Sequence, residues 1–325
     1  MAREFIDGFF AGDLTLWDVN SGSGVAAAAA PTGMPGTYSL YISGAGSLMK
    51  YVTAADEYYM AFRYKPTAST SNDLILFYND ATLLGWLKRN ATTGFLEAYS
   101  EAATLLATGL TNLVANTVYL IEIHYEPNDT AGVFQVKVDS IVDINFSGVT
   151  TGTTAQINRV KLGSEAGDTT NAYFGHIVLD TAAWIGETSI QAIVPTAQGT
   201  TNDWDPSTGF NFQCVDEVPV SDTDYVSTNV VDEIDLFGAG DLVGTIVSVL
   251  AVQVQARCMG IGGPTPTNLQ LACRTGATNY FGASNAVPSV TPQSFAKMWE
   301  LNPNTAAAWL EAGVAGLEIG VKSIA

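Results

Sequence analysis

The sequence has few basic residues. It contains 13 Lys and Arg against 32 Asp and Glu, so the formal net charge is −19 at pH 7. No Lys or Arg occurs between Lys161 and Arg257, a stretch that holds many acids. A surface of this sign repels phosphate backbones, because nucleic acids are polyanions. We therefore expect no nucleic-acid partner; the acidic stretch suits a basic protein surface or a hard cation instead.

Cysteine is scarce as well. Cys214, Cys258 and Cys273 are too few, and odd in number, for a disulfide framework. The sequence contains no Cys-x-x-Cys pair and no Cys/His cluster, the patterns that would indicate a zinc site. We predict that all three are reduced core residues of a protein that folds in a cytoplasm.

Long apolar runs are missing. No stretch of the sequence reaches the roughly 18–20 apolar residues needed to cross a bilayer. The opening Met-Ala-Arg-Glu is not followed by the apolar region of a secretory signal peptide. We expect no membrane partner and no Sec-dependent export.

The sequence is instead rich in short segments with a period of two. In Tyr119–Tyr125 the residues at 119, 121, 123 and 125 are apolar, while Glu122 and His124 fall on the other face. This alternation is typical of a half-buried strand, because successive side chains leave a pleated backbone in opposite directions. The pattern recurs, with little room for helix, in Tyr38–Ser43, Tyr58–Tyr64, Val133–Asp139, Asn158–Gly163 and Tyr173–Asp180. The sequence therefore predicts an all-β fold built around a β-sandwich.

The length of 325 residues suits two domains. We predict a β-sandwich domain over residues 1–195 and a smaller β-rich domain over residues 196–325, the latter serving assembly or subunit contact. Pro195–Pro206 is polar and is predicted to be a linker.

Three further segments carry weaker patterns. Val25–Ala30 is apolar but is followed by Pro31, which predicts a loop or brief helix. Ile246–Arg257 alternates and predicts a strand, whereas Thr291–Trp299 suggests a helical turn.

Several motifs resemble a known family. The segment 119–180 runs from strand to the Asp129-Thr130-Ala131-Gly132 turn, to Val133–Asp139, then to Leu162-Gly163 and Tyr173–Asp180. This order resembles the concanavalin A-like (LamG-type) jelly rolls of tailed-phage virion proteins. Motifs further along resemble the second domain that accompanies this jelly roll: Gly199–Trp204, Cys214–Glu217, Asp224–Val226 and Leu317–Lys322.

The resemblance implies a non-enzymatic structural protein on the surface of a tailed-phage particle, as a capsid decoration or cement protein or as a tail component. Such a protein is made in the host cytoplasm and resides in the virion. Its partners are major capsid or tail proteins and copies of itself in a homo-oligomer, for example a trimer. No cofactor is expected. The alternatives are a carbohydrate-binding adhesin for a host glycan and a jelly-roll glycoside hydrolase.

The hydrolase alternative depends on Glu122-Ile123-His124-Tyr125-Glu126. Glu122, His124 and Glu126 share one strand face, and the segment resembles the Glu-x-Asp-x-Glu signature of jelly-roll glycoside hydrolases. Retaining enzymes of this kind hold two carboxylates about 5–5.5 Å apart. His124 departs from that signature, and a solvated strand face carries such polar residues routinely.

Two further candidate sites follow from residue type. Aromatic side chains on a jelly-roll face stack on sugar rings, although Trp and Tyr equally serve core packing; the candidates are Trp86, Tyr99, Tyr59 and Trp184. Acids of the second half offer oxygen ligands to Ca²⁺ without the spacing of an EF-hand loop. We expect no metal there and ordinary turn acids instead; the residues are Asp216, Glu217, Asp222 and Asp224.

Overall fold

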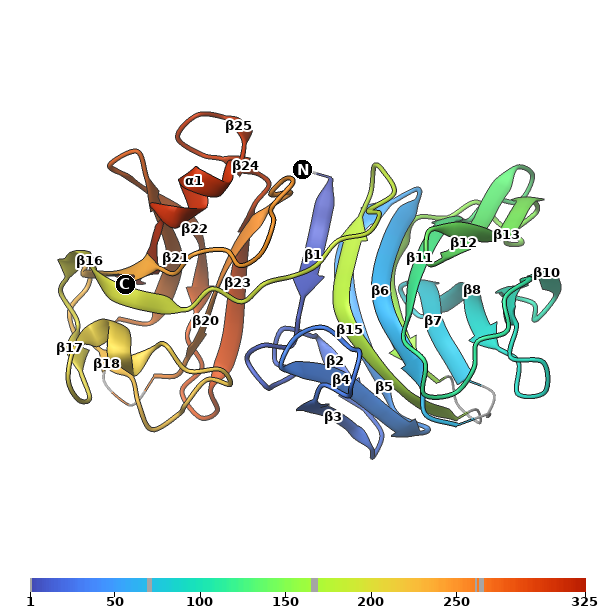
Figure 1. Ribbon diagram of the computed structural model, residues 1–325, viewed down its shortest axis with the longest axis horizontal. Coiled ribbons are helices and arrows are strands. Elements are labelled where there is room, and N and C mark those ends of the chain that lie inside the picture. Colours follow the sequence, from blue (N-terminus) through green and yellow to red (C-terminus); the bar gives the residue numbers. More distant parts are fainter. Residues whose placement is uncertain (1, 69–71, 165–168, 261, 263–265) are drawn as a thin grey trace. The chain divides into compact units, whose positions relative to one another are not determined.

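The computed structural model describes residues 2–68, 72–164, 169–260, 262 and 266–325 (Figure 1). The chain divides into two compact units, Met1–Ile190 and Gln191–Ala325. Both units are built almost entirely from antiparallel strands. The predicted all-β class is confirmed.

The first unit is a sandwich of two sheets (Figure 1). One sheet has eight strands, of which β1 (Arg3–Asp7) pairs with β15 outside the main order. The main order is β13 (Ile141–Gly148), β12 (Gly132–Val138), β11 (Tyr119–Glu126), β6 (Tyr58–Pro66), β15 (Thr170–Asp180), β4 (Tyr38–Gly44) and β3 (Val25–Ala29).

The other sheet has seven strands. Their order is β10 (Leu105–Thr108), β9 (Leu96–Ser100), β8 (Thr82–Arg89), β7 (Asn72–Asn79), β14 (Ile157–Gly163), β5 (Ser47–Ala55) and β2 (Val19–Ser21). The inward side chains of both sheets form one hydrophobic core.

The alternation of β11 sets this core. Tyr125 is fully buried, and its ring centroid lies 4.8 Å from that of Phe134 on β12 and 4.8 Å from that of Phe77 on the facing sheet. The Tyr125 hydroxyl donates to the Leu84 carbonyl oxygen at 2.8 Å, which satisfies the one polar atom of the ring. Gly85 leaves room for this ring, because a Cβ there would lie 2.7 Å from the Tyr125 hydroxyl.

The prediction for Val25–Ala30 is wrong. Residues 25–29 form β3, the edge strand of the eight-stranded sheet, with Val25 opposite Ile42 and Ala29 opposite Tyr38. The ladder with β4 fixes the backbone here, so tertiary pairing overrides the weak β-propensity of the alanine run.

The second unit is centred on a five-stranded sheet. Its order is β16 (Pro195–Asn202), β19 (Ile234–Ala239), β26 (Glu318–Ile324), β21 (Asn268–Thr275) and β22 (Thr278–Ala286). Three two-stranded ribbons and two short helices complete the described part: β17 (Asp205–Pro206) with β18 (Val226–Ser227), β20 (Val252–Cys258) with β23 (Gln293–Trp299), β24 (Leu301–Asn302) with β25 (Ala307–Ala308), η1 (Asn211–Cys214) and α1 (Glu311–Ala315). Its core gathers around Trp309, Leu271 and Cys273.

Two predictions for this half are wrong, and one is partly confirmed. Pro195–Pro206 is not a linker, because β16 occupies most of it and pairs with β19. Thr291–Trp299 contains no helical turn, because its residues from Gln293 onward form β23, which pairs with β20. Of the strand predicted over Ile246–Arg257, only the part from Val252 onward is β20.

The three cysteines are free, and Cys214 and Cys273 are buried. Burial raises the pKa of the Cys273 thiol to about 12 and that of Cys258 to about 11. Within the described ranges, no helix is long and apolar enough to cross a membrane.

Candidate functional site

The outer face of the eight-stranded sheet is shaped by a tight hairpin between β12 and β13. Asp139 and Ser140 both have left-handed backbones, with φ of 49° and 67°. That conformation matches a two-residue hairpin turn whose twist suits the flanking strands. The Asp139 carboxylate also accepts the Leu120 N–H at 2.8 Å, which ties the turn to β11.

A β-bulge at Asp143 then sets which side chains face outward. Val136 opposes Ile144, whereas Lys137 opposes Val142, so Asp143 is the extra residue. Asp143 Oδ1 accepts the Leu110 and Thr111 backbone N–H groups at 2.9 and 2.7 Å.

Residues 181–190 cross the outer face of the same sheet. Ile185 packs on Ala61, Leu120 and Val178, which are outward residues of β6, β11 and β15. Trp184, next to Ile185, is placed over β11 and β12 by this packing.

Several hydrogen bonds hold this segment to the sheet, among them one from the Arg63 guanidinium of β6 to Glu187 Oε1. The Gly186 N–H donates to Glu122 Oε1 at 2.8 Å, and the Ile190 N–H donates to His176 Nδ1 at 3.1 Å. His176 is buried, and its desolvation lowers its pKa to about 4. The neutral imidazole is therefore the form that accepts the Ile190 N–H at neutral pH.

Tyr59, His124 and Trp184 form an aromatic cluster on this face. The rings of Tyr59 and His124 stack at 4.1 Å, and Trp184 meets both edge-on, at 5.7 and 6.0 Å. Glu57 Oε2 lies 2.6 Å from His124 Nε2 and accepts the Tyr59 hydroxyl at 3.2 Å. Burial and the Glu57 carboxylate raise the pKa of Tyr59 to about 12.

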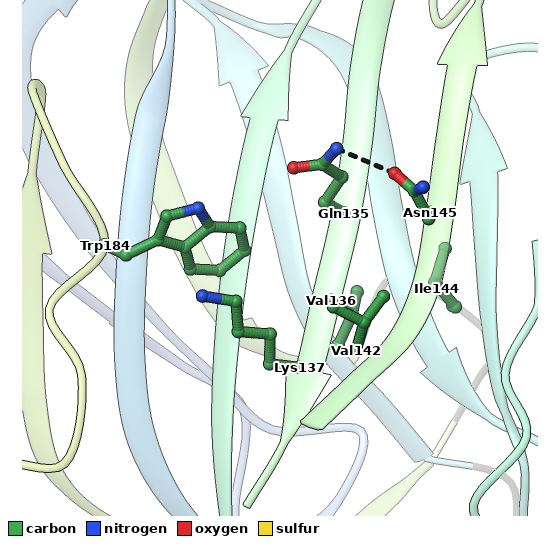
Figure 2. Close-up of a pocket in the computed structure, with 7 residues that line it drawn as sticks. All are labelled: Gln135, Val136, Lys137, Val142, Ile144, Asn145 and Trp184. Atoms are coloured by element: carbon green, nitrogen blue, oxygen red, sulfur yellow. Dashed lines mark hydrogen bonds between the residues drawn. The ribbon is translucent and has the colours of Figure 1, made fainter. Parts of the chain in front are cut away.

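Beside this cluster lies an open pocket of about 250 Å³, which we call the Trp184 pocket (Figure 2). Figure 2 shows the Lys137 ammonium against the Trp184 indole, 3.8 Å from the ring centroid. On the far side of the pocket, Gln135 Nε2 donates to Asn145 Oδ1 at 2.7 Å. The lining residues are Gln135, Val136, Lys137, Val142, Ile144, Asn145 and Trp184.

The residues of the hydrolase alternative share one strand, but they do not form a pair of accessible carboxylates. Glu122 is 1% exposed and lies under residues 181–190. Glu126, the last residue of β11, is only partly buried. His124 is held between Glu57 and the aromatic rings rather than between the two acids.

The four predicted sugar-stacking residues divide between the two sheets. Tyr59 and Trp184 meet on the eight-stranded sheet, whereas Trp86 and Tyr99 lie on β8 and β9 of the seven-stranded sheet. The rings of Trp86 and Tyr99 stack on each other at 5.0 Å with an interplanar angle of 9°. The Tyr99 hydroxyl also donates to Glu97 Oε2 at 2.7 Å, so this pair packs mainly against its own strands.

The four acids of the calcium alternative have other partners in the structure. Asp222 accepts two hydrogen bonds from Arg257, at 2.7 and 2.9 Å, and these lower its pKa. Asp224 accepts the Ser207 hydroxyl at 2.7 Å, and Glu217 has its pKa raised by burial. In the part of the chain that the structure describes, no group of three or more His, Cys, Asp or Glu side chains is placed to hold a metal ion. Asp216 therefore belongs to no such group either.

The sequence alone does not identify Gln135, Lys137 and Asn145 as pocket residues. Gln135 and Lys137 stand out only as the polar half of an alternating strand, like many other outward residues. Their place beside Trp184 depends on the Asp143 bulge and on the crossing of residues 181–190, neither of which has a sequence signature.

Comparisons with known proteins give no family. No protein-family model matches the chain, and no curated protein matches it. Among solved structures, a Bacillus subtilis protein of unknown function with a galectin-like fold is 10% identical with a TM-score of 0.41; the match covers 57% of this chain and 98% of that one.

Two other solved structures are similar at the same level. Domain 4 of a GH43 extracellular arabinanase from Geobacillus stearothermophilus, in complex with arabinotriose, is 12% identical with a TM-score of 0.40, over 56% of this chain and 95% of that one. A sialidase is 14% identical with a TM-score of 0.40; the match covers 55% of this chain and only 18% of the sialidase. The description of the first unit as a two-sheet antiparallel sandwich rests on its own strand order.

Proposed function

We propose that the chain is a non-enzymatic structural subunit of a tailed-phage particle, placed on its surface as a decoration or cement protein or as a tail component. The proposal also makes the second unit the subunit-contact region of a homo-oligomer. The resemblance of the sequence to virion jelly rolls supplies the context, and the surface of the second unit supplies the physical argument.

The observation that carries the proposal is an apolar patch on the second unit. An isolated bridge joins Val249 to Trp309, and β24 pairs with β25, which places Leu301 opposite Ala308. These pairings bring three separate stretches of chain side by side, and each stretch carries exposed apolar residues. We call them the bridge patch: Val247 at 95% exposure, Leu250, Leu301, Ala308 and Leu310. Exposed apolar residues that cluster in this way are typical of protein–protein contacts.

The test is the composition of particles purified by density gradient from the phage–host culture that encodes the chain. We expect peptides of the chain at a fixed ratio to the major shell protein, high for a capsid surface protein and low for a tail component. Absence from the particles, together with a monomer in native mass spectrometry at high concentration, would overturn the proposal. Release of reducing ends from glycans would overturn its non-enzymatic part.

A second candidate function, carbohydrate binding, is favoured by the Trp184 pocket. The pocket combines an indole, two amides and an ammonium on an open strand face. Sites for polar small molecules typically pair apolar walls with a few placed hydrogen-bonding groups. A glycan array on the intact chain tests this function: binding without turnover supports an adhesin role.

A further inference from the structure

We propose that the Trp184 pocket binds an acidic sugar, a pyranose that carries a carboxylate. The inference rests on the second candidate function and names its ligand class. Three features of the pocket carry it: an amide pair, a lysine without an acidic partner, and an apolar wall.

The amide pair offers one acceptor next to one donor. The Gln135–Asn145 hydrogen bond uses Gln135 Nε2 and Asn145 Oδ1. Within the described residues, Gln135 Oε1 and Asn145 Nδ2 have no hydrogen-bond partner, and both amides line the pocket (Figure 2). Neighbouring hydroxyls of a sugar each donate and accept, so a vicinal diol satisfies both atoms.

Lys137 supplies a positive charge. Its contact is the Trp184 ring, and no carboxylate of the described residues forms an ion pair with it. Glu122 faces Lys137 across the β11–β12 ladder, but its carboxylate is directed to the Gly186 N–H beneath residues 181–190. The ammonium has three donors, and a ligand carboxylate forms stronger, charge-assisted hydrogen bonds with it than a neutral hydroxyl does.

The apolar wall suits the C–H groups of a pyranose. Lys137 covers part of the indole, so contact falls on the uncovered part of Trp184 and on Val142, which is 55% exposed. The net charge of −19 repels anions at long range. Recognition of an acidic sugar therefore depends on the short-range contact with Lys137, and removal of that one charge should abolish the preference for acids.

The experiment uses the full chain. A glycan array with uronic acid, sialic acid and neutral glycans is followed by calorimetric titration with a galacturonic acid trimer and with its methyl ester. We expect the free acid to bind at least about tenfold more tightly than the ester, because the ester loses the charge-assisted hydrogen bond. Among the indole N–H signals of the six tryptophans, that of Trp184 should shift.

Matched variants assign the effect to the pocket. Lys137→Gln should bind acid and ester equally weakly, whereas Lys161→Gln should keep the wild-type ratio; Lys161 also lies over an aromatic ring, that of Tyr78, on the seven-stranded sheet. Trp184→Ala should lose binding of both ligands, and Trp86→Ala should lose neither. Thermal melting of each variant checks that it is folded.

The remaining outcomes separate the two claims. Equal affinity of the wild type for acid and ester would overturn the acidic-sugar inference and leave carbohydrate binding intact. No binding to any glycan by a folded wild-type chain would overturn both. Neither result bears on the presence of the chain in particles, which is measured independently.

Discussion

The two compact units differ in where their large apolar side chains lie. In the first unit, two sheets enclose one core, and the bulkiest fully buried side chains of the described residues, such as Tyr58 and Tyr125, belong to it. In the second unit a smaller core surrounds Trp309, while Val247 and Val290 stay 95% and 85% exposed. Both units leave some apolar side chains exposed, such as Leu110 of the first unit at 81%, but the shorter second unit has more of them and a smaller core, so it offers more apolar area for another surface to cover.

The largest effect should come from the core of the first unit. Phe134 packs against Tyr125 and Phe77, and Phe134→Ala leaves a cavity among them. We expect the free energy of unfolding of the first unit to fall by about 3–5 kcal/mol. Calorimetry combined with hydrogen exchange would assign the loss to this unit. Val290→Ser should change stability by less than about 0.5 kcal/mol; an equal loss of protection in both units would contradict separate cores.

Acid should remove the contribution of His176 to the stability of the first unit. The folded pKa of His176, about 4, lies below the unfolded value of 6.5, so the neutral form is favoured in the fold. This contribution is full above pH 6.5 and falls as the pH drops toward 4, by about 2–3 kcal/mol. Asp7 of the same unit changes in the opposite direction, so the effect of His176 is the difference between the wild type and His176→Asn at each pH. His176→Asn should remove this fall, because Asn tolerates the left-handed backbone (φ 49°) and offers an acceptor to Ile190. Urea titrations at pH 4 and pH 7 measure the difference.

Two buried aspartates, one in each unit, should respond differently to amide substitution at pH 8. Burial raises the pKa of both Asp7 and Asp235 to about 7, above the unfolded value of 3.8. Their contributions to stability are therefore full below pH 3.8 and are lost as the pH rises through 7. Asp235 accepts one hydrogen bond, from Asn211, so Asp235→Asn should stabilise the second unit by about 2 kcal/mol.

Asp7 is the contrasting case. Its oxygens accept both the Phe9 N–H, at 2.7 Å, and the Trp17 Nε1–H, at 2.8 Å. An amide accepts only one of these and turns its own NH₂ toward the other, so Asp7→Asn should stabilise less or destabilise. Melting temperatures at pH 8 and pH 3 test both substitutions. Equal increases in stability at the two positions at pH 8 would show that loss of the negative charge, and not the hydrogen bonds, determines the effect.

The smallest effect on stability should come from the bridge patch. Val247→Asp alters a side chain that is almost fully exposed, so unfolding should change by less than about 0.5 kcal/mol. Self-association should weaken, because a charge enters an apolar contact. Sedimentation velocity measures the self-association. The control is Leu110→Asp, because Leu110 is 81% exposed and belongs to the first unit. If Leu110→Asp weakened self-association and Val247→Asp did not, the self-association contact would lie on the first unit.

The sequence predicts the strands of the first unit well because the side chains on the two faces of these strands differ from each other in polarity. Tyr119–Tyr125 and Tyr58–Tyr64 alternate, and they are β11 and β6 of the structure. Where one face is not clearly polar, the period of two disappears. Val25–Ala29 is uniformly apolar and Pro195–Asn202 mostly polar, yet both are strands because a neighbouring ladder pairs with them.

The candidate site was predictable only as residue types. Tyr59, His124 and Trp184 come from three separate parts of the chain, and their meeting depends on register, which one extra residue at Asp143 alters along β13. Trp86 and Tyr99 have the same aromatic character, but they lie on the other sheet. Residue type thus indicated which side chains could contact a sugar. Which of them lie together could be known only from the strand order of the structure.

The alternation of β12 has a consequence for how specificity can change over evolutionary time. Gln135 and Lys137 face the pocket, while their immediate neighbours Phe134 and Val138 are buried in the core. Each outward position can therefore mutate with little effect on folding, so new ligand preferences can be sampled without first acquiring compensatory changes in the interior.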